Sequence, residues 1–330
     1  MAGGVFRILS LFSGAEGLDL GFVGGFEYLG RHYPANGFRV VAAYDSNPAA
    51  VATYNANLGP VCRLADLASL PEEALPQAEV VLGGFPCQDF SLAGRRQGIA
   101  THRGRLYLAM VRAVARVRPL VFVAENVRGL LSANGGAALE AMVEDFASAG
   151  PGYRLQMALL DAADYGVPQR RERLFLVGTR SDLPQGFAFP EPTHADPRRG
   201  LLLLLGRSPW VTAQEALSDL EDERRLASLP NPEYSRATRN AGQGNEPLHS
   251  HRPAPTVRAE HHGNIQFHYR LPRRLSVREA ARLQSFPDAF RFAASMSEAY
   301  RLVGNAVPPL LAWHLGRAVR DCLESVKREG

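Results

Sequence analysis

Short apolar runs, each bounded by glycine, proline or polar residues, recur along the first half of the chain. They span residues 5–12, 38–44, 79–82, 120–124, 154–160 and 174–178. Runs of this length between turn signals are typical of strands buried in a sheet. Segments with the apolar spacing of helices lie between them, at residues 48–57, 106–117 and 138–149. This alternation of strands and helices predicts an α/β fold.

The first predicted strand leads into a glycine-containing turn, Ser13-Gly14-Ala15-Glu16-Gly17-Leu18. A strand, a glycine turn and a helix commonly open a nucleotide-binding unit, in which backbone N–H groups face a ligand. An ordinary βα loop has the same pattern. Asp45 ends the second predicted strand, where a carboxylate commonly binds the ribose of an adenosine cofactor. Asp66 either accepts from an adenine amino group or caps a helix ahead of Ala68.

A cysteine follows the third predicted strand in the stretch Gly83-Gly84-Phe85-Pro86-Cys87-Gln88. The glycines allow a tight turn and a close approach to a ligand, and Pro86 stiffens the corner. A thiol held at a strand end acts as a nucleophile when its pKa is lowered, because the thiolate is the attacking species. The alternative is a small buried apolar residue beside a turn. The surrounding motif favours the nucleophile.

A basic segment follows the cysteine at residues 93–105 and includes Arg95, Arg96, Arg103 and three glycines. Its positive charge favours a thiolate nearby, and its composition suits a loop that closes on a phosphate backbone. A solvated basic loop without a partner is the alternative.

Charged residues also lie at the ends of the later predicted strands. Glu125 follows the run 120–124 and reaches the same sheet edge as Cys87. A carboxylate beside a cysteine at neighbouring strand ends is typical of an active site. The alternative is a structural anion paired with Arg128. Alternation places Arg171 and Arg173 on one face of an extended segment, where two guanidinium groups suit an anion or a carbonyl group. A surface ladder of salt bridges is the alternative there.

The composition changes between residues 181 and 274, where prolines, arginines and histidines gather. This part resembles an inserted module that reads a polyanion. The histidines lack a regular ligand spacing, so we predict no metal site. Capping boxes at Thr212 and Ser276 open two helices. Farther along, we expect a turn at Gly304-Asn305 before the double proline and the last apolar helix.

The chain length, the formal charge and the cysteine content limit the class of protein. The 330 residues suffice for one large domain or two unequal ones, and the formal charge of +4 permits a nucleic-acid partner. The three cysteines, Cys62, Cys87 and Cys322, form no C-x-x-C pair, which fits a reducing compartment. The N-terminus carries no secretory pattern, and no apolar run is long enough to span a membrane. We therefore expect a cytoplasmic protein.

The ordered motifs resemble those of the C5-cytosine-specific DNA methyltransferases over nearly the whole chain. The matching residues are Phe12-Ser13-Gly14 with Gly17, Asp45, Asp66, Pro86-Cys87-Gln88, Arg103-Gly104 with Leu106, Glu125-Asn126-Val127, Gln169-Arg170-Arg171-Glu172-Arg173 and Gly304-Asn305. The resemblance implies a Rossmann-like mixed seven-stranded sheet with helices on both faces. It also implies a discontinuous catalytic domain, 1–181 and 275–330, around a smaller target recognition domain, 182–274.

The resemblance also implies the chemistry. The target cytosine leaves the duplex, Cys87 adds to its C6 atom, and Glu125, protonated in a dry pocket, donates to N3. Arg173 contacts O2, and Arg171 supports the backbone. The methyl donor is S-adenosylmethionine, which becomes S-adenosylhomocysteine, and no metal takes part. The residues at the family's cofactor positions are Phe12, Ser13, Gly14, Ala15, Gly17, Leu18, Asp45, Ser46, Asp66, Leu67, Pro86, Leu106, Asn305 and Ala306.

Double-stranded DNA is the expected partner. The residues expected to contact it are Ser91, Arg95, Arg96, Gln243, Arg252, Thr256 and Arg258. In some bacterial members a glutamine such as Gln243 fills the space left by the flipped base, and a threonine such as Thr256 binds the adjacent phosphate.

The chain departs from the family pattern at three places. Glu16 replaces the first glycine of a Gly-Gly pair, so a carboxylate either lies near the sulfonium or points away from it. Ser46 stands where a tryptophan often stacks on adenine, so either another apolar side chain stacks there or the affinity for the cofactor falls. The segment from Gly24 to Gly37 is longer than in compact members, and we assign it no role.

The main interpretation is a monomeric modification enzyme of a bacterial restriction–modification system, paired with a cognate endonuclease. A relative that methylates tRNA shares the catalytic residues. The large arginine-bearing segment favours duplex DNA, since RNA enzymes read a single-stranded loop. A catalytically inactive DNA-binding regulator is a third possibility, which the intact Cys87, Glu125 and Arg173 disfavour. An amino-methylating enzyme would need an Asp/Asn-Pro-Pro-Tyr/Phe loop, which is absent.

Overall fold

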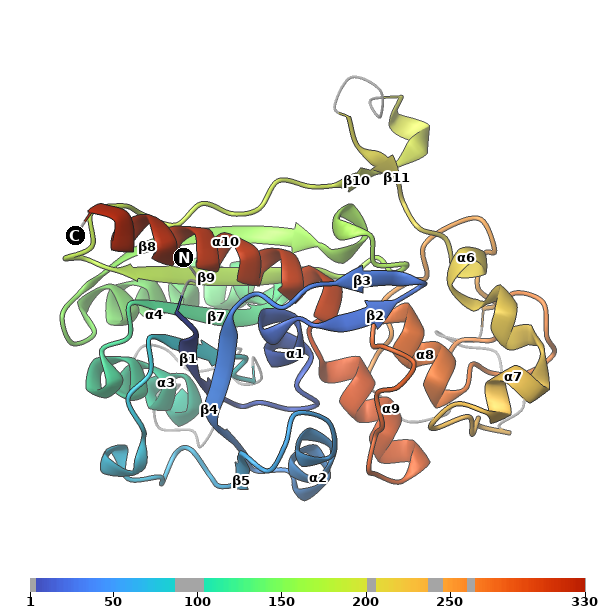
Figure 1. Ribbon diagram of the computed structural model, residues 1–330, viewed down its shortest axis with the longest axis horizontal. Helices are drawn as coiled ribbons and strands as arrows, with labels where there is room; N and C mark the ends of the chain where they lie inside the picture. The colour runs from blue at the N-terminus through green and yellow to red at the C-terminus, as the bar shows by residue number, and fades with distance from the viewer. Residues whose placement is uncertain (1–3, 87–103, 201–205, 237–245, 260–264, 330) are drawn as a thin grey trace.

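The computed structural model describes residues 4–86, 104–200, 206–236, 246–259 and 265–329 (Figure 1). Its central element is a seven-stranded sheet of described residues, in the order β5-β4-β1-β6-β7-β9-β8. The strands are β1 (Phe6–Leu11), β4 (Phe38–Asp45), β5 (Cys62–Leu64), β6 (Val80–Gly83), β7 (Val121–Val127), β8 (Tyr153–Asp161) and β9 (Glu172–Arg180). The predicted α/β fold and the seven-stranded sheet are confirmed.

The directions of the strands determine which strand ends lie next to one another. Strands β5, β4, β1, β6 and β7 pair in parallel, whereas β9 is antiparallel to β7 and β8 is antiparallel to β9. The sheet is therefore mixed. The parallel strands end along one edge, and β9 begins at that same edge because it runs in the opposite direction. Residues at the end of β7 and at the start of β9 thus become neighbours.

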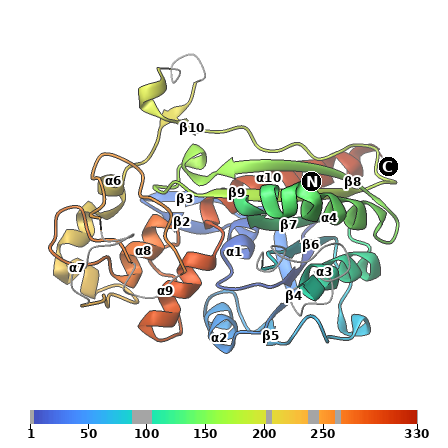
Figure 2. The same ribbon diagram turned by 180° about the vertical axis from the view of Figure 1, so that it is seen from behind.

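Helices cover both faces of the sheet (Figures 1 and 2). The helices α1 (Gly17–Val23), α2 (Pro48–Asn57) and α10 (Pro309–Glu329) pack on one face, together with Ile8 and Val80. The helices α3 (Gly104–Val117) and α4 (Ala137–Ser148) pack on the other face, with Leu9 and Val81. Successive residues of β1 and β6 thus enter opposite cores, as expected for strands buried on both sides.

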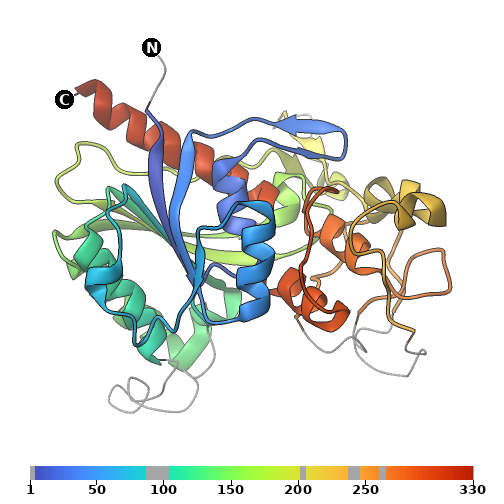
Figure 3. The same ribbon diagram turned by 60° about the horizontal axis from the view of Figure 1, so that its bottom comes forward.

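A second lobe lies beside the sheet, at the right of Figure 1 and Figure 3. It contains α6 (Ala213–Leu217), the 3₁₀ turn η5 (Ser218–Glu221), α7 (Glu223–Ala227), α8 (Val277–Leu283) and α9 (Met296–Asn305). The segment after β9 reaches it through the short strands β10 (His194–Ala195) and β11 (Ser208–Pro209). Its apolar residues join the core on the α1 face of the sheet. The division at residues 181 and 274 stays a prediction.

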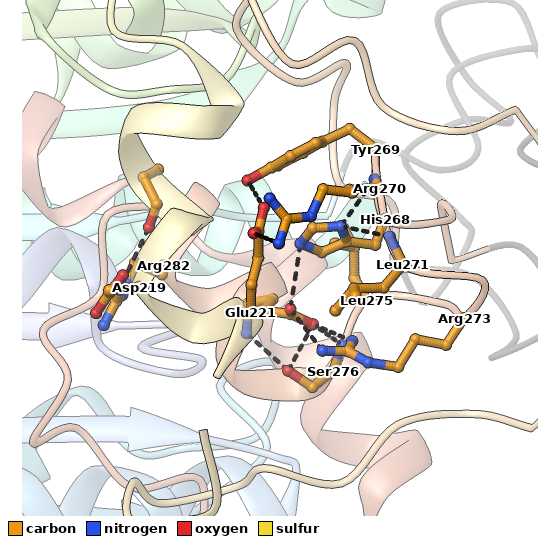
Figure 4. Close-up of polar contacts among 12 residues, drawn as sticks. Asp219, Glu221, His268, Tyr269, Arg270, Leu271, Arg273, Leu275, Ser276 and Arg282 are labelled. Atoms are coloured by element: carbon orange, nitrogen blue, oxygen red, sulfur yellow. Dashed lines mark hydrogen bonds and ion pairs between the residues drawn. The ribbon is translucent and has the colours of Figure 1, made fainter. Parts of the chain in front are cut away.

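The buried carboxylate of Glu279 lies in the second lobe near His268, Arg273 and Ser276, which are labelled in Figure 4. The carboxylate of Glu279 accepts from Nη1 of Arg273 at 2.7 Å and from the hydroxyl of Ser276 at 2.9 Å. Nδ1 of His268 accepts from the backbone N–H groups of Arg270 and Leu271, so the ring proton lies on Nε2, which faces Glu279 at 3.7 Å. Burial lowers the pKa of His268. This histidine is therefore a neutral structural group.

Several arginines of the second lobe form ion pairs or hydrogen bonds with other residues of the same lobe. Arg270 pairs with Glu221 at 2.7 Å, and the largely buried Arg274 donates to the carbonyl of Ile265. These arginines, which the sequence assigns to a polyanion-reading module, stabilise the lobe itself. Within the described residues no group of histidine, cysteine and acidic side chains could hold a metal ion, and no helix could span a membrane.

The segment from Gly24 to Gly37, to which the sequence assigns no role, forms a hairpin of β2 (Phe26–Tyr28) and β3 (Arg31–Tyr33), and it packs on α10. The indole N–H of Trp313 donates to the carbonyl of Pro34 at 2.9 Å, which ties the two together. The predicted turn at Gly304-Asn305 is wrong, because both residues belong to the last turn of α9. The predicted capping boxes at Thr212 and Ser276 are confirmed.

Candidate active site

A pocket of about 530 Å³ opens at the edge where the parallel strands end. The ends of β1, β4, β6 and β7 contribute to it, together with the segment that joins α9 to α10. The predicted cofactor residues in its lining are Phe12, Ser13, Gly14, Ala15, Leu18, Asp45, Ser46, Asp66, Leu67, Pro86, Leu106, Asn305 and Ala306. Residues far apart in the sequence thus meet as the resemblance implies.

Gly17 is the predicted cofactor residue that lies outside this lining. A Cβ atom at Gly17 would overlap the carbonyl group of Val307. Its glycine is therefore needed for the close packing of α1 against the segment after α9. Val307 itself lines the pocket, so Gly17 acts on the site through this contact.

Asp45 holds the first glycine turn in place. Its Oδ2 accepts from the backbone N–H of Gly14, and its Oδ1 accepts from that of Asn47, both at 2.8 Å. Gly14 has a φ of 55°, a left-handed conformation that suits glycine. Burial raises the pKa of Asp45, against the backbone N–H groups that lower it. The carboxylate lines the pocket, so it can still accept from a ligand hydroxyl.

The lining suits an adenosine compound in several respects. A carboxylate ends β4 at the position that commonly binds ribose, and residues of the glycine turn before α1 also line the pocket. Asp66 also lines the pocket while its Oδ1 accepts from the backbone N–H of Ala68 at 3.0 Å. This contact closes a turn at residues 67–69, and the predicted helix cap is wrong because no helix begins there. Apolar side chains such as Leu67 and Leu18 are placed to contact a base in the absence of an aromatic residue at Ser46.

Glu16 is fully buried and lies outside the pocket lining. It adopts a left-handed φ of 57° in a turn where a glycine would be unstrained. Burial, aided by the nearby Asp19, raises the pKa of Glu16 to about 10. The carboxyl group is therefore neutral at pH 7, and it offers no negative charge to a sulfonium. Sequence reasoning missed Asp19, which lines the pocket, accepts from the hydroxyl of Ser10 at 2.7 Å, and has a pKa raised by burial to about 7.

Glu125 and Arg173 form the polar end of the pocket. Each is about nine-tenths buried, and Nε of Arg173 lies 2.8 Å from Oε1 of Glu125. Burial raises the pKa of Glu125, although Arg173 and Arg171 oppose the shift. Arg128 pairs instead with Glu172 at 2.7 Å, so the alternative of a Glu125–Arg128 pair is wrong. A buried carboxyl group with a raised pKa is suited to donate a proton.

Arg171 is buried beneath the site. Its Nη1 donates to the carbonyl of Val257 at 2.9 Å, and its Nη2 donates to the carbonyl of Gly304 at 2.5 Å. Burial and the neighbouring Arg173 lower its pKa well below the ordinary value. Because a guanidinium group starts from a very high pKa, we expect it to stay charged. The geometry agrees with a role in holding the backbone.

The loop after β6 is held against β7. Nδ2 of Asn126 donates to the carbonyl of Phe85 at 2.9 Å, and Oδ1 of Asn126 accepts from the N–H of Val127 at the same distance. A Cβ atom on Gly84 would lie 2.9 Å from Oε2 of Glu125, so glycine is needed there. Sequence reasoning assigned no role to Asn126, although its place beside Glu125 in the motif was a usable signal.

Several predicted residues lie outside the described part of the chain. They are Cys87, Ser91, Arg95, Arg96 and Gln243. The described loop runs as far as Pro86, directly before the cysteine. Among the predicted DNA contacts that are described, Arg252 and Arg258 are exposed. The hydroxyl of Thr256 donates to the carbonyl of Arg170 at 2.8 Å, which places this segment beside Arg171.

The chain is similar to known proteins over nearly its whole length. A family model, the C-5 cytosine-specific DNA methylase, matches residues 6–321. The Type II methyltransferase M.NgoFVII of Neisseria gonorrhoeae is 35% identical over 95% of this chain and 86% of its own length. The Type II methyltransferase M.FnuDI of Fusobacterium nucleatum is 34% identical over 98% of this chain and 97% of its own length.

Solved structures share the fold. A prophage-encoded protein of E. coli, described as a DNA modification methyltransferase, superimposes with a TM-score of 0.72 at 21% identity. The match covers 97% of this chain and 99% of that one. The S. pombe Dnmt2 methyltransferase has a TM-score of 0.67 at 18% identity, covering 97% of this chain and 98% of that one. The family match over residues 6–321 is the decisive observation, and the chain belongs to the C-5 cytosine-specific DNA methylase family.

Proposed function

We propose that the protein methylates C5 of a cytosine within a specific duplex DNA sequence, as the modification enzyme of a restriction–modification system. The relatives with 34–35% identity are named Type II methyltransferases. The observation that carries the proposal is the position of Glu125, which lines the pocket with a raised pKa beside the loop that leads into Cys87. We expect the enzyme to act as a cytoplasmic monomer alongside a cognate endonuclease.

The cofactor of this reaction is S-adenosylmethionine, which supplies an electrophilic methyl group when bound. Asp45 is placed to accept from the ribose, and the turn at Ser13 and Gly14 presents backbone to the ligand. Asp66 and Leu67 line the pocket and would contact the adenine. Asn305 and Ala306 also contribute to its wall. The neutral Glu16 lies behind this site, outside the lining.

Cys87 would begin the reaction. Its thiolate forms a bond to C6 of the flipped cytosine while Glu125 gives its proton to N3, so the electron pair of the C5–C6 bond becomes available at C5. After the methyl group is attached to C5, the C5 proton leaves to a base. The sulfur–C6 bond would then break, which restores the ring and regenerates the thiolate, and N3 would return its proton to Glu125. The burial that raises the pKa of Glu125 favours the protonated form that this step requires.

The arginines would orient these groups. Arg173 keeps the carboxyl group of Glu125 in place through the 2.8 Å contact. It would also contact the cytosine O2. Arg171 holds the backbone at Val257 and Gly304 and so supports the wall of the pocket. The predicted DNA contacts Arg252, Thr256 and Arg258 are carried on the segment next to Arg171, which would place the phosphates near the catalytic edge.

The covalent step can be tested directly. Bisulfite sequencing of DNA from cells that express the protein should show 5-methylcytosine in one sequence context. A duplex with 5-fluorocytosine at that position should be trapped on the wild-type protein in the presence of methyl donor. Cys87→Ala should bind the same duplex without trapping or turnover. Methylation of tRNA in place of DNA, or turnover by Cys87→Ala, would contradict the proposal.

A further inference from the structure

Two buried chains of hydrogen bonds connect the segment 254–259 to the wall of the cofactor pocket. In the first, Arg171 donates to the carbonyl of Val257 at 2.9 Å and to the carbonyl of Gly304 at 2.5 Å. In the second, the N–H of Val257 donates to Oε1 of Gln169 at 2.9 Å. The backbone carbonyl and the backbone N–H of Val257 are thus both bonded to side chains of the segment 169–171.

The second chain continues to the cofactor wall through a second glutamine. Nε2 of Gln169 donates to Oε1 of Gln284 at 2.5 Å, and Nε2 of Gln284 donates to the carbonyl of Ala306 at 2.5 Å. Because a backbone N–H can only donate, the oxygen of Gln169 must face Val257. This orientation determines that of Gln284 in turn. Neither glutamine has measurable exposure.

The two chains end on either side of one pocket residue. Gly304 and Ala306 flank Asn305, and both Asn305 and Ala306 line the cofactor pocket. At the other end, Val257 lies between Thr256 and Arg258, which we expect to contact DNA. Gly304 also packs directly on this segment, because a Cβ atom there would overlap the backbone of Arg258 and Ala259. A displacement of Val257 is therefore transmitted to the carbonyl groups beside Asn305.

We propose that Gln284 is a positioning residue that couples DNA binding at 256–258 to cofactor binding at Asn305 and Ala306. The inference rests on the proposed function, since it assumes that both ligands bind where that function requires. A coupling of this kind is reciprocal: each ligand tightens the binding of the other by the same factor. The buried chain supplies the physical link that such a coupling needs.

Gln284→Met tests this link because methionine has a similar length and cannot donate to Ala306. The cofactor product S-adenosylhomocysteine serves as the probe, so no turnover interferes. Its dissociation constant is measured with and without the duplex that carries the methylated site, and the dissociation constant of the duplex is measured with and without the product. For the wild type we expect a coupling factor of about fivefold or more. For Gln284→Met we expect this factor to fall by about half or more, because only the Arg171 chain still joins Val257 to Gly304.

Tyr300→Phe is the matched control. The Tyr300 hydroxyl is buried in α9 and donates to the carbonyl of Leu275 at 2.6 Å, so its removal also leaves one buried carbonyl without this donor. It has no part in the Gln169–Gln284 chain and should keep the wild-type factor. If Gln284→Met does not fold, Gln169→Met breaks the same chain and is read in the same way.

The outcomes separate the two proposals. An intact factor in the folded glutamine variant, an equal loss in Tyr300→Phe, or a factor of one in the wild type would overturn the coupling. Failure of the proposed function would be visible separately, as a wild-type protein that does not methylate the duplex. A reduced factor in the glutamine variant alone, with the wild-type factor kept in Tyr300→Phe, supports Gln284 as the positioning residue.

Discussion

Arg173 contacts Glu125 diagonally across the antiparallel pair of β9 and β7. Arg173 stands opposite Val127 in the register, and Glu125 stands opposite Phe175, two positions along each strand. Residues two apart share a face of a sheet, so the two side chains point the same way and meet at 2.8 Å. The reversal of β9 therefore brings a guanidinium group to the carboxyl group that lines the pocket.

Replacing Glu125 by glutamine should remove the proton donor and leave the shape of the site. We expect the single-turnover rate of methyl transfer to fall by about a hundredfold or more, as for a lost general acid. Binding of S-adenosylhomocysteine should change little. Glu172→Gln is the control, because Glu172 pairs with Arg128 at the same sheet edge. A wild-type rate in Glu125→Gln would remove the proposed role of this residue.

Replacing Gly84 by alanine should displace Glu125. The added Cβ atom would lie 2.9 Å from Oε2 of Glu125, closer than side chains tolerate. Because catalysis depends strongly on geometry, we expect kcat to fall by about tenfold to a hundredfold. Gly186→Ala is the matched control, since its Cβ atom would meet Nε2 of Gln156 at an ordinary 3.7 Å. Equal kcat values in the two variants would show that the loop at Gly84 can accommodate the added Cβ atom without displacing Glu125.

Replacing Glu16 by glutamine should flatten the pH dependence of stability. The folded protein holds the proton on Glu16 until about pH 10, whereas the unfolded chain releases it near pH 4. Folding therefore takes up a proton within this range, and the free energy of unfolding of the wild type falls as the pH rises through it. Asp19, with a pKa of about 7, contributes in the same direction below neutral pH.

Urea unfolding at pH 6 and pH 9 measures the effect of Glu16. The free energy of unfolding should decline less in Glu16→Gln than in the wild type over this interval. The decline due to Asp19 should remain in both proteins. If the two proteins lose the same stability between these pH values, Glu16 is not held neutral in the folded state.

Replacing Arg252 or Arg258 by glutamine should weaken the binding of DNA and reduce its salt dependence. Each lost phosphate contact should lower the slope of log K against log salt by about one. Arg7→Gln is the matched control, because Arg7 pairs with Glu79 at the start of β1, on the opposite edge of the sheet from the pocket. An unchanged slope in the Arg252 and Arg258 variants would mean that these side chains face away from DNA.

The parts of the site that could be predicted lie at strand ends. Asp45 and Glu125 each follow an apolar run directly, so their place at the edge of the sheet follows from local pattern. The position of the glycine turn after β1 also follows from the local sequence pattern. The hairpin at Gly24–Gly37 and the helical end of α9 were not predicted, because contacts with α10 and with the 254–259 segment stabilise them.

Local apolar runs and turns place Asp45 and Glu125 at strand ends, and this much can be read from the amino-acid order alone. The contacts of these residues depend on how distant segments pack. The pairing of Arg173 with Glu125, and of Arg128 with Glu172, depends on the register of β9 against β7. The contact of Gln169 with Gln284 joins residues 115 positions apart, and a buried amide leaves no periodic signal in a sequence.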